Sequence, residues 1–107
     1  MEYRNYIELE KISLRYQYYC FIDTKEHLAD GIFEQHQIAV RFDSEYVKKG
    51  EKYQFIFCKV RKRDKILFVK AMEELKKKML LIGNVDYEAF CLKTMESMLN
   101  ESEKYAS

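Results

Sequence analysis

The sequence predicts a small α+β domain in which a three-stranded, antiparallel sheet carries an antiparallel helical hairpin, formed by the C-terminal part of the chain, on one face. Two stretches alternate apolar and polar residues, as strands with one buried face do. A third stretch is apolar on both faces, which is typical of a central strand, and after residue 63 the apolar period becomes that of helices. The length of 107 residues and the absence of proline, repeats or a linker predict a single domain.

The first strand is expected over residues 12–22. Polar residues occupy odd positions of its first half, and the even positions are expected to face the core. These even positions are Ile12, Leu14, Tyr16, Tyr18, Cys20 and Ile22. Residues 1–10 fit a helical turn as well as a strand, so their structure stays open.

A short helix or a turn is expected over residues 24–30, because Asp23 and Glu26 resemble a capping box and Gly31 is a plausible terminator. The second strand is expected over residues 32–42, where alternation resumes and the inward residues are Ile38, Val40 and Phe42. Residues 52–60, apolar on both faces, are expected to form the middle of the sheet.

Two helices are expected to complete the domain, with Asp64 and Asp86 as N-terminal caps and Gly83 with Asn84 between them. Their apolar stripes are Phe68, Met72, Leu75, Met79 and Ile82 in the first helix and Tyr87, Phe90, Cys91, Met95 and Met98 in the second. The tail from Asn100 is expected to fray. The residues predicted to be buried are Phe55, Ile56, Phe57, Phe68, Met72, Leu75, Phe90 and Met95.

The composition is that of a soluble globular protein, with 48% hydrophobic and 35% charged residues. The longest apolar run has only five residues, and the N-terminus carries acids where a signal peptide would be apolar, so neither a membrane partner nor export is expected. Cys20, Cys58 and Cys91 lie far apart in apolar stretches. Free thiols and a cytoplasmic location are therefore expected.

Catalytic and cofactor signatures are missing from the sequence. No closely spaced Cys or His residues point to a metal, and three scattered glycines cannot form a phosphate-binding loop. Cys20, Asp23 and His27 are the nearest approach to a nucleophile with its base, but Cys20 belongs to the inward phase of its strand, where a thiol stays protonated. We therefore expect no metal, no cofactor and no enzymatic activity.

The charge is unevenly distributed along the chain, although the net charge is only +1. Residues 48–78 contain twelve Lys and Arg against four acids, and five cations cluster where the central strand passes into the first helix: Lys59, Arg61, Lys62, Arg63 and Lys65. Beside strand aromatics such as Tyr19 and Tyr53, these cations could bind a phosphate backbone while bases stack on the rings. Alternatively, they form an ordinary solvated strand end.

Two functions remain after these exclusions. The leading expectation is a small, non-enzymatic, cytoplasmic binding module that acts through protein contacts, including self-association. The alternative is a nucleic-acid-binding accessory domain that uses the basic segment 59–65.

Overall fold

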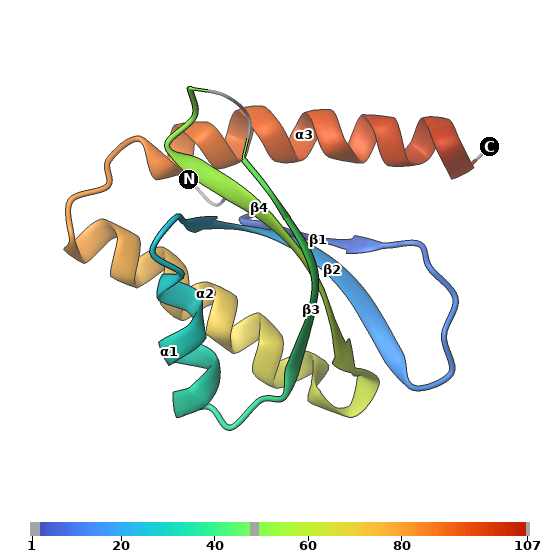
Figure 1. Ribbon diagram of the computed structural model, residues 1–107. Helices are drawn as coiled ribbons and strands as arrows, with labels where there is room; N and C mark the ends of the chain where they lie inside the picture. The colour runs from blue at the N-terminus through green and yellow to red at the C-terminus, as the bar shows by residue number, and fades with distance from the viewer. Residues whose placement is uncertain (1–2, 48–49, 107) are drawn as a thin grey trace.

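The computed structural model describes the backbone of residues 3–47 and 50–106 and the side chains up to residue 97 (Figure 1). It has an antiparallel sheet of four strands in the order β1-β2-β4-β3, with three α-helices. The strands are β1 (Tyr6–Leu9), β2 (Tyr16–Thr24), β3 (Val40–Tyr46) and β4 (Tyr53–Arg61). The helices are α1 (Leu28–Gln35), the 3₁₀ turn η1 (Lys62–Asp64), α2 (Lys65–Leu81) and α3 (Tyr87–Ala106). The α+β class and the antiparallel sheet are confirmed, but the prediction of three strands is wrong.

The additional strand comes from the first ten residues. β1 pairs with β2, Ile7 lying opposite Cys20, and the Ile7 side chain is buried. The prediction that the next strand begins at residue 12 is wrong, because Ile12 and Leu14 lie in the β1–β2 connection and are 101% and 95% exposed. These two residues continue the alternating pattern of β2, but they do not belong to the sheet.

The predicted strand over residues 32–42 is also wrong in its first half. Ala29, Ile32 and Phe33 are buried at the three- and four-residue spacing of a helix, and they form the inner face of α1. Gly31 lies inside α1 and does not terminate it. The chain leaves α1 through Gln37, whose φ of 57° is left-handed, and β3 begins at Val40.

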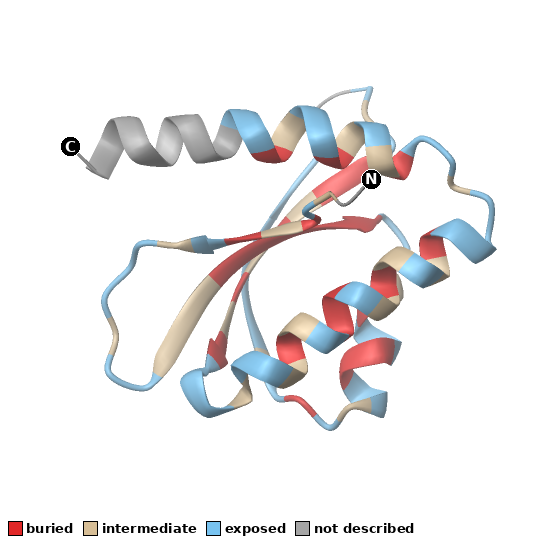
Figure 2. Cartoon of the chain, turned by 180° about the vertical axis from the view of Figure 1, so that it is seen from behind, coloured by how far each residue is buried: buried red, intermediate tan, exposed pale blue. Residues whose placement is uncertain are grey.

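The helices cover both faces of the sheet, so the predicted hairpin on one face is wrong (Figures 1 and 2). On one face, which we call the α2 face, Phe68 of α2 stacks on Tyr19 with ring centroids 4.1 Å apart. On the other face, the α3 face, the Tyr87 hydroxyl donates to the Ile22 carbonyl oxygen, and Phe90 packs on Phe55. Consecutive side chains of a strand point to opposite faces, and residues 19–24 of β2 are all buried, so both faces require cover.

The predicted core is confirmed for five residues and wrong for three. The buried ones are Ile56, Phe68, Met72, Leu75 and Met95, whereas Phe55, Phe57 and Phe90 are only half-buried. Ile82 falls outside the stripe of α2 and is 53% exposed, and the side chain of Met98 lies outside the described residues. The inner position of β4 in the sheet is confirmed.

The starts of the two long helices agree with the sequence, but their predicted caps do not. The expectation that the tail frays from Asn100 is wrong for the backbone, since α3 continues to Ala106. α2 ends at Leu81, and Gly83 takes a left-handed φ of 82°. Asp64 makes no side-chain capping bond. The Asp86 carboxylate accepts a hydrogen bond from the Tyr53 hydroxyl at 2.6 Å, and thereby fixes the start of α3 to β4.

Candidate nucleic-acid interface

Three cations and two tyrosine rings alternate across the α3 face of the sheet. Lys11 Nζ lies 4.5 Å from the ring centroid of Tyr18, and Lys59 Nζ lies 5.8 Å from Tyr18 and 4.7 Å from Tyr16. The guanidinium carbon of Arg41 lies 5.6 Å from the Tyr16 centroid. These distances are those of cation–π contacts. We call the set Lys11, Tyr18, Lys59, Tyr16 and Arg41 the cation–aromatic row.

The pairing of three strands assembles this row. The register of β2 and β4 sets Tyr18 opposite Lys59, and that of β3 and β4 sets Arg41 opposite the same lysine. Tyr16 stands two residues before Tyr18 and therefore faces the same side. β3 stays in register through Arg41 and Phe42, and its pairing with β4 shifts only between Phe42 and Ser44. The row thus joins residues that are up to 48 positions apart in the sequence.

The row remains accessible because α3 buries only part of its face. Tyr16, Tyr18 and Lys59 are half-buried, while Lys11 and Arg41 are exposed. In contrast, Cys20 and Ile22, further along the same face of β2, are fully buried. The first three residues of β2 therefore present the rings of Tyr16 and Tyr18 to solvent.

The ion pairs that the structure describes join acidic side chains to basic side chains outside the row. Among the side chains that the structure describes, no ion pair involves Lys11, Arg41 or Lys59. Within the basic segment, the described ion pair joins Lys65 Nζ to Glu8 Oε1 at 2.8 Å. Glu8 pairs across the strands with Tyr19, which faces α2, so this carboxylate belongs to the opposite face. Within the part of the chain whose side chains the structure describes, no ion pair neutralises the cations of the row.

The structure divides the five cations of the basic segment. Lys59 belongs to the row, and Arg61 lies opposite Tyr16 at the exposed end of β4. Lys62 and Arg63 are exposed in η1, where neither joins a described ion pair. Lys65 is held by Glu8, which raises the pKa of its ammonium group through a hydrogen bond and charge attraction. Only Lys59 and Arg61 are thus brought beside the rings.

The aromatic part of the site differs from the prediction. Tyr19 and Tyr53 are 0% and 1% exposed and cannot take a base. Tyr16 and Tyr18, assigned by their alternation to the buried face, are the rings that meet the cations. Lys11 and Arg41 lie outside the basic segment and were missed, since strand pairing cannot be read from local charge density. A signal was present, because Arg41 lies inside the stretch predicted as the second strand and Lys11 directly precedes the stretch predicted as the first.

The set Cys20, Asp23 and His27 does not form a catalytic site. Cys20 faces α3, whereas Asp23 faces α1 on the other side of the sheet. Burial raises the pKa of the Cys20 thiol to about 12, so this thiol remains protonated. Among the described residues, no three His, Cys, Asp or Glu side chains gather as metal ligands.

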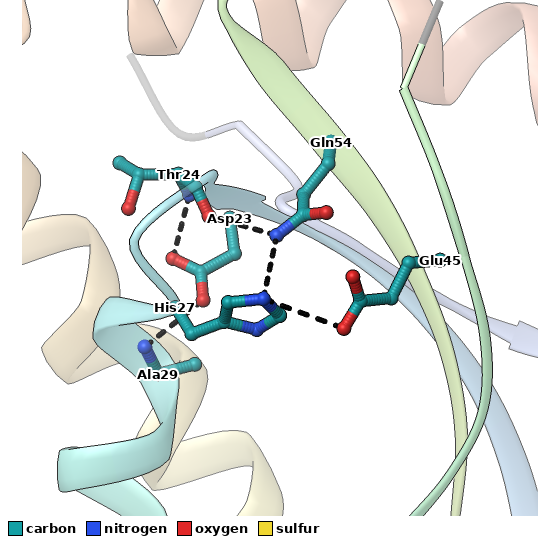
Figure 3. A network of polar contacts seen from close by, with 6 residues as sticks. All are labelled: Asp23, Thr24, His27, Ala29, Glu45 and Gln54. Atoms are coloured by element: carbon teal, nitrogen blue, oxygen red, sulfur yellow. Dashed lines mark hydrogen bonds and ion pairs between the residues drawn. The ribbon is translucent and has the colours of Figure 1, made fainter.

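Asp23 and His27 belong instead to a polar network between β2, α1, β3 and β4 (Figure 3). The Asp23 carboxylate accepts the backbone N–H groups of Thr24 and Ala29, at 2.7 and 3.0 Å. His27 Nε2 lies 3.4 Å from Glu45 Oε1 and 3.5 Å from Gln54 Nε2. These contacts hold the start of α1 against the sheet, which is a structural role.

Comparisons of the chain with protein-family models, with curated proteins and with solved structures gave no match. No helix within the described residues is long and apolar enough to cross a membrane. The interpretation of the row therefore depends on its own geometry and chemistry.

Proposed function

We propose that this chain is a nucleic-acid-binding accessory domain that uses the cation–aromatic row as its contact surface. The observation that carries this proposal is the alternation of three cations with two ring faces on one side of the sheet. Phosphates are neutralised by Lys and Arg, and bases stack on aromatic rings. The row offers both kinds of contact within one surface.

The free-energy balance favours the exchange of a cation for a base. An exposed cation–π contact contributes about 0.5–1 kcal/mol, whereas a base stacked on an aromatic side chain contributes about 1–3 kcal/mol. A base that displaces Lys59 from Tyr16 therefore gains more than the lysine loses. The released ammonium group can then pair with a neighbouring phosphate.

The proposal is tested by fluorescence anisotropy of labelled oligonucleotides between about 50 and 200 mM salt. The wild-type chain is expected to bind with an affinity that falls as salt rises. The double variant Arg41→Gln with Lys59→Gln should bind at least tenfold more weakly, since about two phosphate contacts are lost. A matched control, Lys70→Gln with Lys77→Gln, removes the same charge from exposed positions on α2 and should bind like wild type.

Two results would refute this function. One is the absence of any salt-sensitive binding by the wild-type chain. The other is an equal loss of affinity in the row variant and in the α2 variant, which would mean that net charge alone attracts the oligonucleotide.

A protein-contact function, the leading expectation from the sequence, is the second candidate. It is favoured by an exposed apolar corner at the end of α2 and in the α2–α3 connection. Four large apolar side chains within six positions are 53–85% exposed there: Leu80, Leu81, Ile82 and Val85. Contiguous exposed apolar groups are a common mark of protein interfaces.

The occupant that we propose for this apolar corner is a second copy of the chain. A patch around a two-fold axis needs only to match itself, and apolar side chains do so without opposed charges. Light scattering during size-exclusion chromatography should give a mass that rises with concentration, and Leu81→Ser with Val85→Ser should return it to the monomer mass of 13.0 kDa. A wild-type chain that stays monomeric at millimolar concentration excludes this occupant.

A further inference from the structure

The two rings of the cation–aromatic row are spaced for unstacked bases. Tyr16 and Tyr18 are alternate residues of β2, so their Cα atoms are separated by about 6.6 Å, twice the rise per strand residue. Successive bases along one strand of B-DNA are only about 3.4 Å apart. Two neighbouring bases that each cover one of these rings must therefore have separated from each other.

The order of groups along the row matches the order of groups along a nucleic acid strand. The row reads cation, ring, cation, ring, cation, with Lys59 within reach of both rings. A single strand with its bases turned toward a protein presents phosphate, base, phosphate, base and phosphate. The row is thus complementary to a short segment in which both the charges and the base faces are available.

A duplex cannot make the ring contacts. Its bases cover one another, and its major groove accepts a helix or a two-stranded ribbon. Tyr16, Tyr18 and Lys59 lie instead on the two inner strands of a four-stranded sheet, where the rings are half-buried. A duplex could therefore meet only the cations of the row.

We infer that the ligand of the cation–aromatic row is a single-stranded nucleic acid, whose consecutive bases stack on Tyr16 and Tyr18 while its phosphates meet Lys11, Lys59 and Arg41. This inference rests on the proposed nucleic-acid-binding function and specifies its ligand. The contacts named use only ring faces and charges, and every base has a stacking face, so the binding should show little sequence preference.

The test compares single strands with the duplex of the same sequence by fluorescence anisotropy at constant salt. The probes are a mixed-sequence oligodeoxynucleotide of about 12 nucleotides, its RNA counterpart and the DNA duplex, a length within the footprint of known single-strand binders. Wild type should bind at least one single strand about tenfold more tightly than the duplex. The comparison of the DNA and RNA arms identifies which backbone is preferred.

Variants then separate the rings from the charges. Tyr16→Leu with Tyr18→Leu should lose at least tenfold in single-strand affinity and leave duplex affinity unchanged, whereas Tyr16→Phe with Tyr18→Phe should bind like wild type because the rings remain. Tyr46→Leu is the control, since Tyr46 is 56% exposed on β3 and lies outside the row. Circular dichroism melting curves establish that each variant is folded.

The outcomes distinguish the inferred preference for a single strand from the proposed nucleic-acid binding itself. Equal or tighter binding of the duplex by the wild-type chain overturns the inference and leaves nucleic-acid binding in place. Binding of neither form overturns both. The comparison of the two forms needs no variant, so it decides the question even if the leucine pair unfolds the domain.

Discussion

The carboxylate of Asp23, near the end of β2, accepts the backbone N–H of Ala29, in the first turn of α1, at 3.0 Å. Because His27 precedes that turn with a left-handed φ of 58° and offers no side-chain cap, the helix takes its capping carboxylate from the strand. The same carboxylate also accepts the N–H of Thr24. One buried acid thus connects the sheet to the helix that covers it.

The buried carboxyl of Asp23 is expected to make the free energy of unfolding fall as pH rises from about 4 to about 6. Burial raises the pKa of this carboxyl from its ordinary value of 3.8 to about 6. The two N–H donors and His27 lower the pKa in part, and the charge of Asp30 raises it slightly. The folded state thus binds the proton more tightly than the unfolded state. The stabilising contribution is complete below about pH 4 and is lost above pH 6, with a size of roughly 3 kcal/mol.

Urea unfolding of wild type and of Asp23→Asn between pH 4 and pH 7 measures this contribution. The difference between their unfolding free energies should change across that interval. Asp43→Asn, at an exposed position of β3, is the control and should differ from wild type by a constant amount. A constant difference for Asp23→Asn as well would contradict the prediction.

Phe68→Ala is expected to lower the unfolding free energy by about 3–5 kcal/mol. Phe68 is fully buried and its ring packs against four others, those of Tyr6, Tyr19, Phe21 and Phe33. Chemical denaturation gives the value, and Ile66→Ala in the same helix, at a site 71% exposed, should cost no more than about 0.5 kcal/mol. A loss below about 1 kcal/mol for Phe68→Ala would be inconsistent with its place at the centre of the core.

The three cysteines are expected to be unreactive in the folded protein. Each is fully buried, and burial raises the pKa of the Cys20 and Cys91 thiols to about 12 and that of Cys58 further still. Because the thiolate is the reactive form, an aromatic disulfide reagent should label none of them at pH 7 and all three in guanidinium chloride. Rapid labelling of native protein would show that one of these sites opens to solvent.

The salt dependence of binding should report the number of cations in the row. For a single strand, each phosphate neutralised contributes about 0.7 to the slope of log affinity against log salt. Arg41→Gln with Lys59→Gln should therefore reduce the slope by about 1.4, whereas Tyr16→Leu with Tyr18→Leu should lower the affinity and leave the slope unchanged. Parallel losses of slope in both variants would mean that the rings act only by positioning the cations.

Sequence patterns predicted the helices better than the strands. The stripe Phe68, Met72, Leu75 and Met79 marks α2 correctly, because a long helix repeats its period many times. α1 has only eight residues, and its Ile32 happens to stand an even number of positions before Ile38 and Val40. The alternating pattern of the strand therefore extended back into the helix, and no local feature marked Gln37, the left-handed residue between α1 and β3.

The candidate site was only half visible in the sequence because strand pairing creates it. Lys59 and Arg61 stand out as part of a charge cluster, but Arg41 reaches Tyr16 only after β3 has paired with β4. The alternation of Tyr16 and Tyr18 correctly assigns them to one face of a strand. It cannot tell that α3 buries this face at Cys20 and Ile22 and leaves the earlier part accessible.

The division of β2 between two faces makes the protein intolerant of small insertions and deletions there. Insertion of one residue between Tyr18 and Tyr19 would invert the phase of every strand residue before the insertion, so that Tyr16 and Tyr18 would face α2 and the polar Gln17 would face solvent on the other side. Insertion of two residues at the same point would preserve the phase and only lengthen the exposed hairpin. We therefore expect natural variants of this strand to differ in length by even numbers of residues.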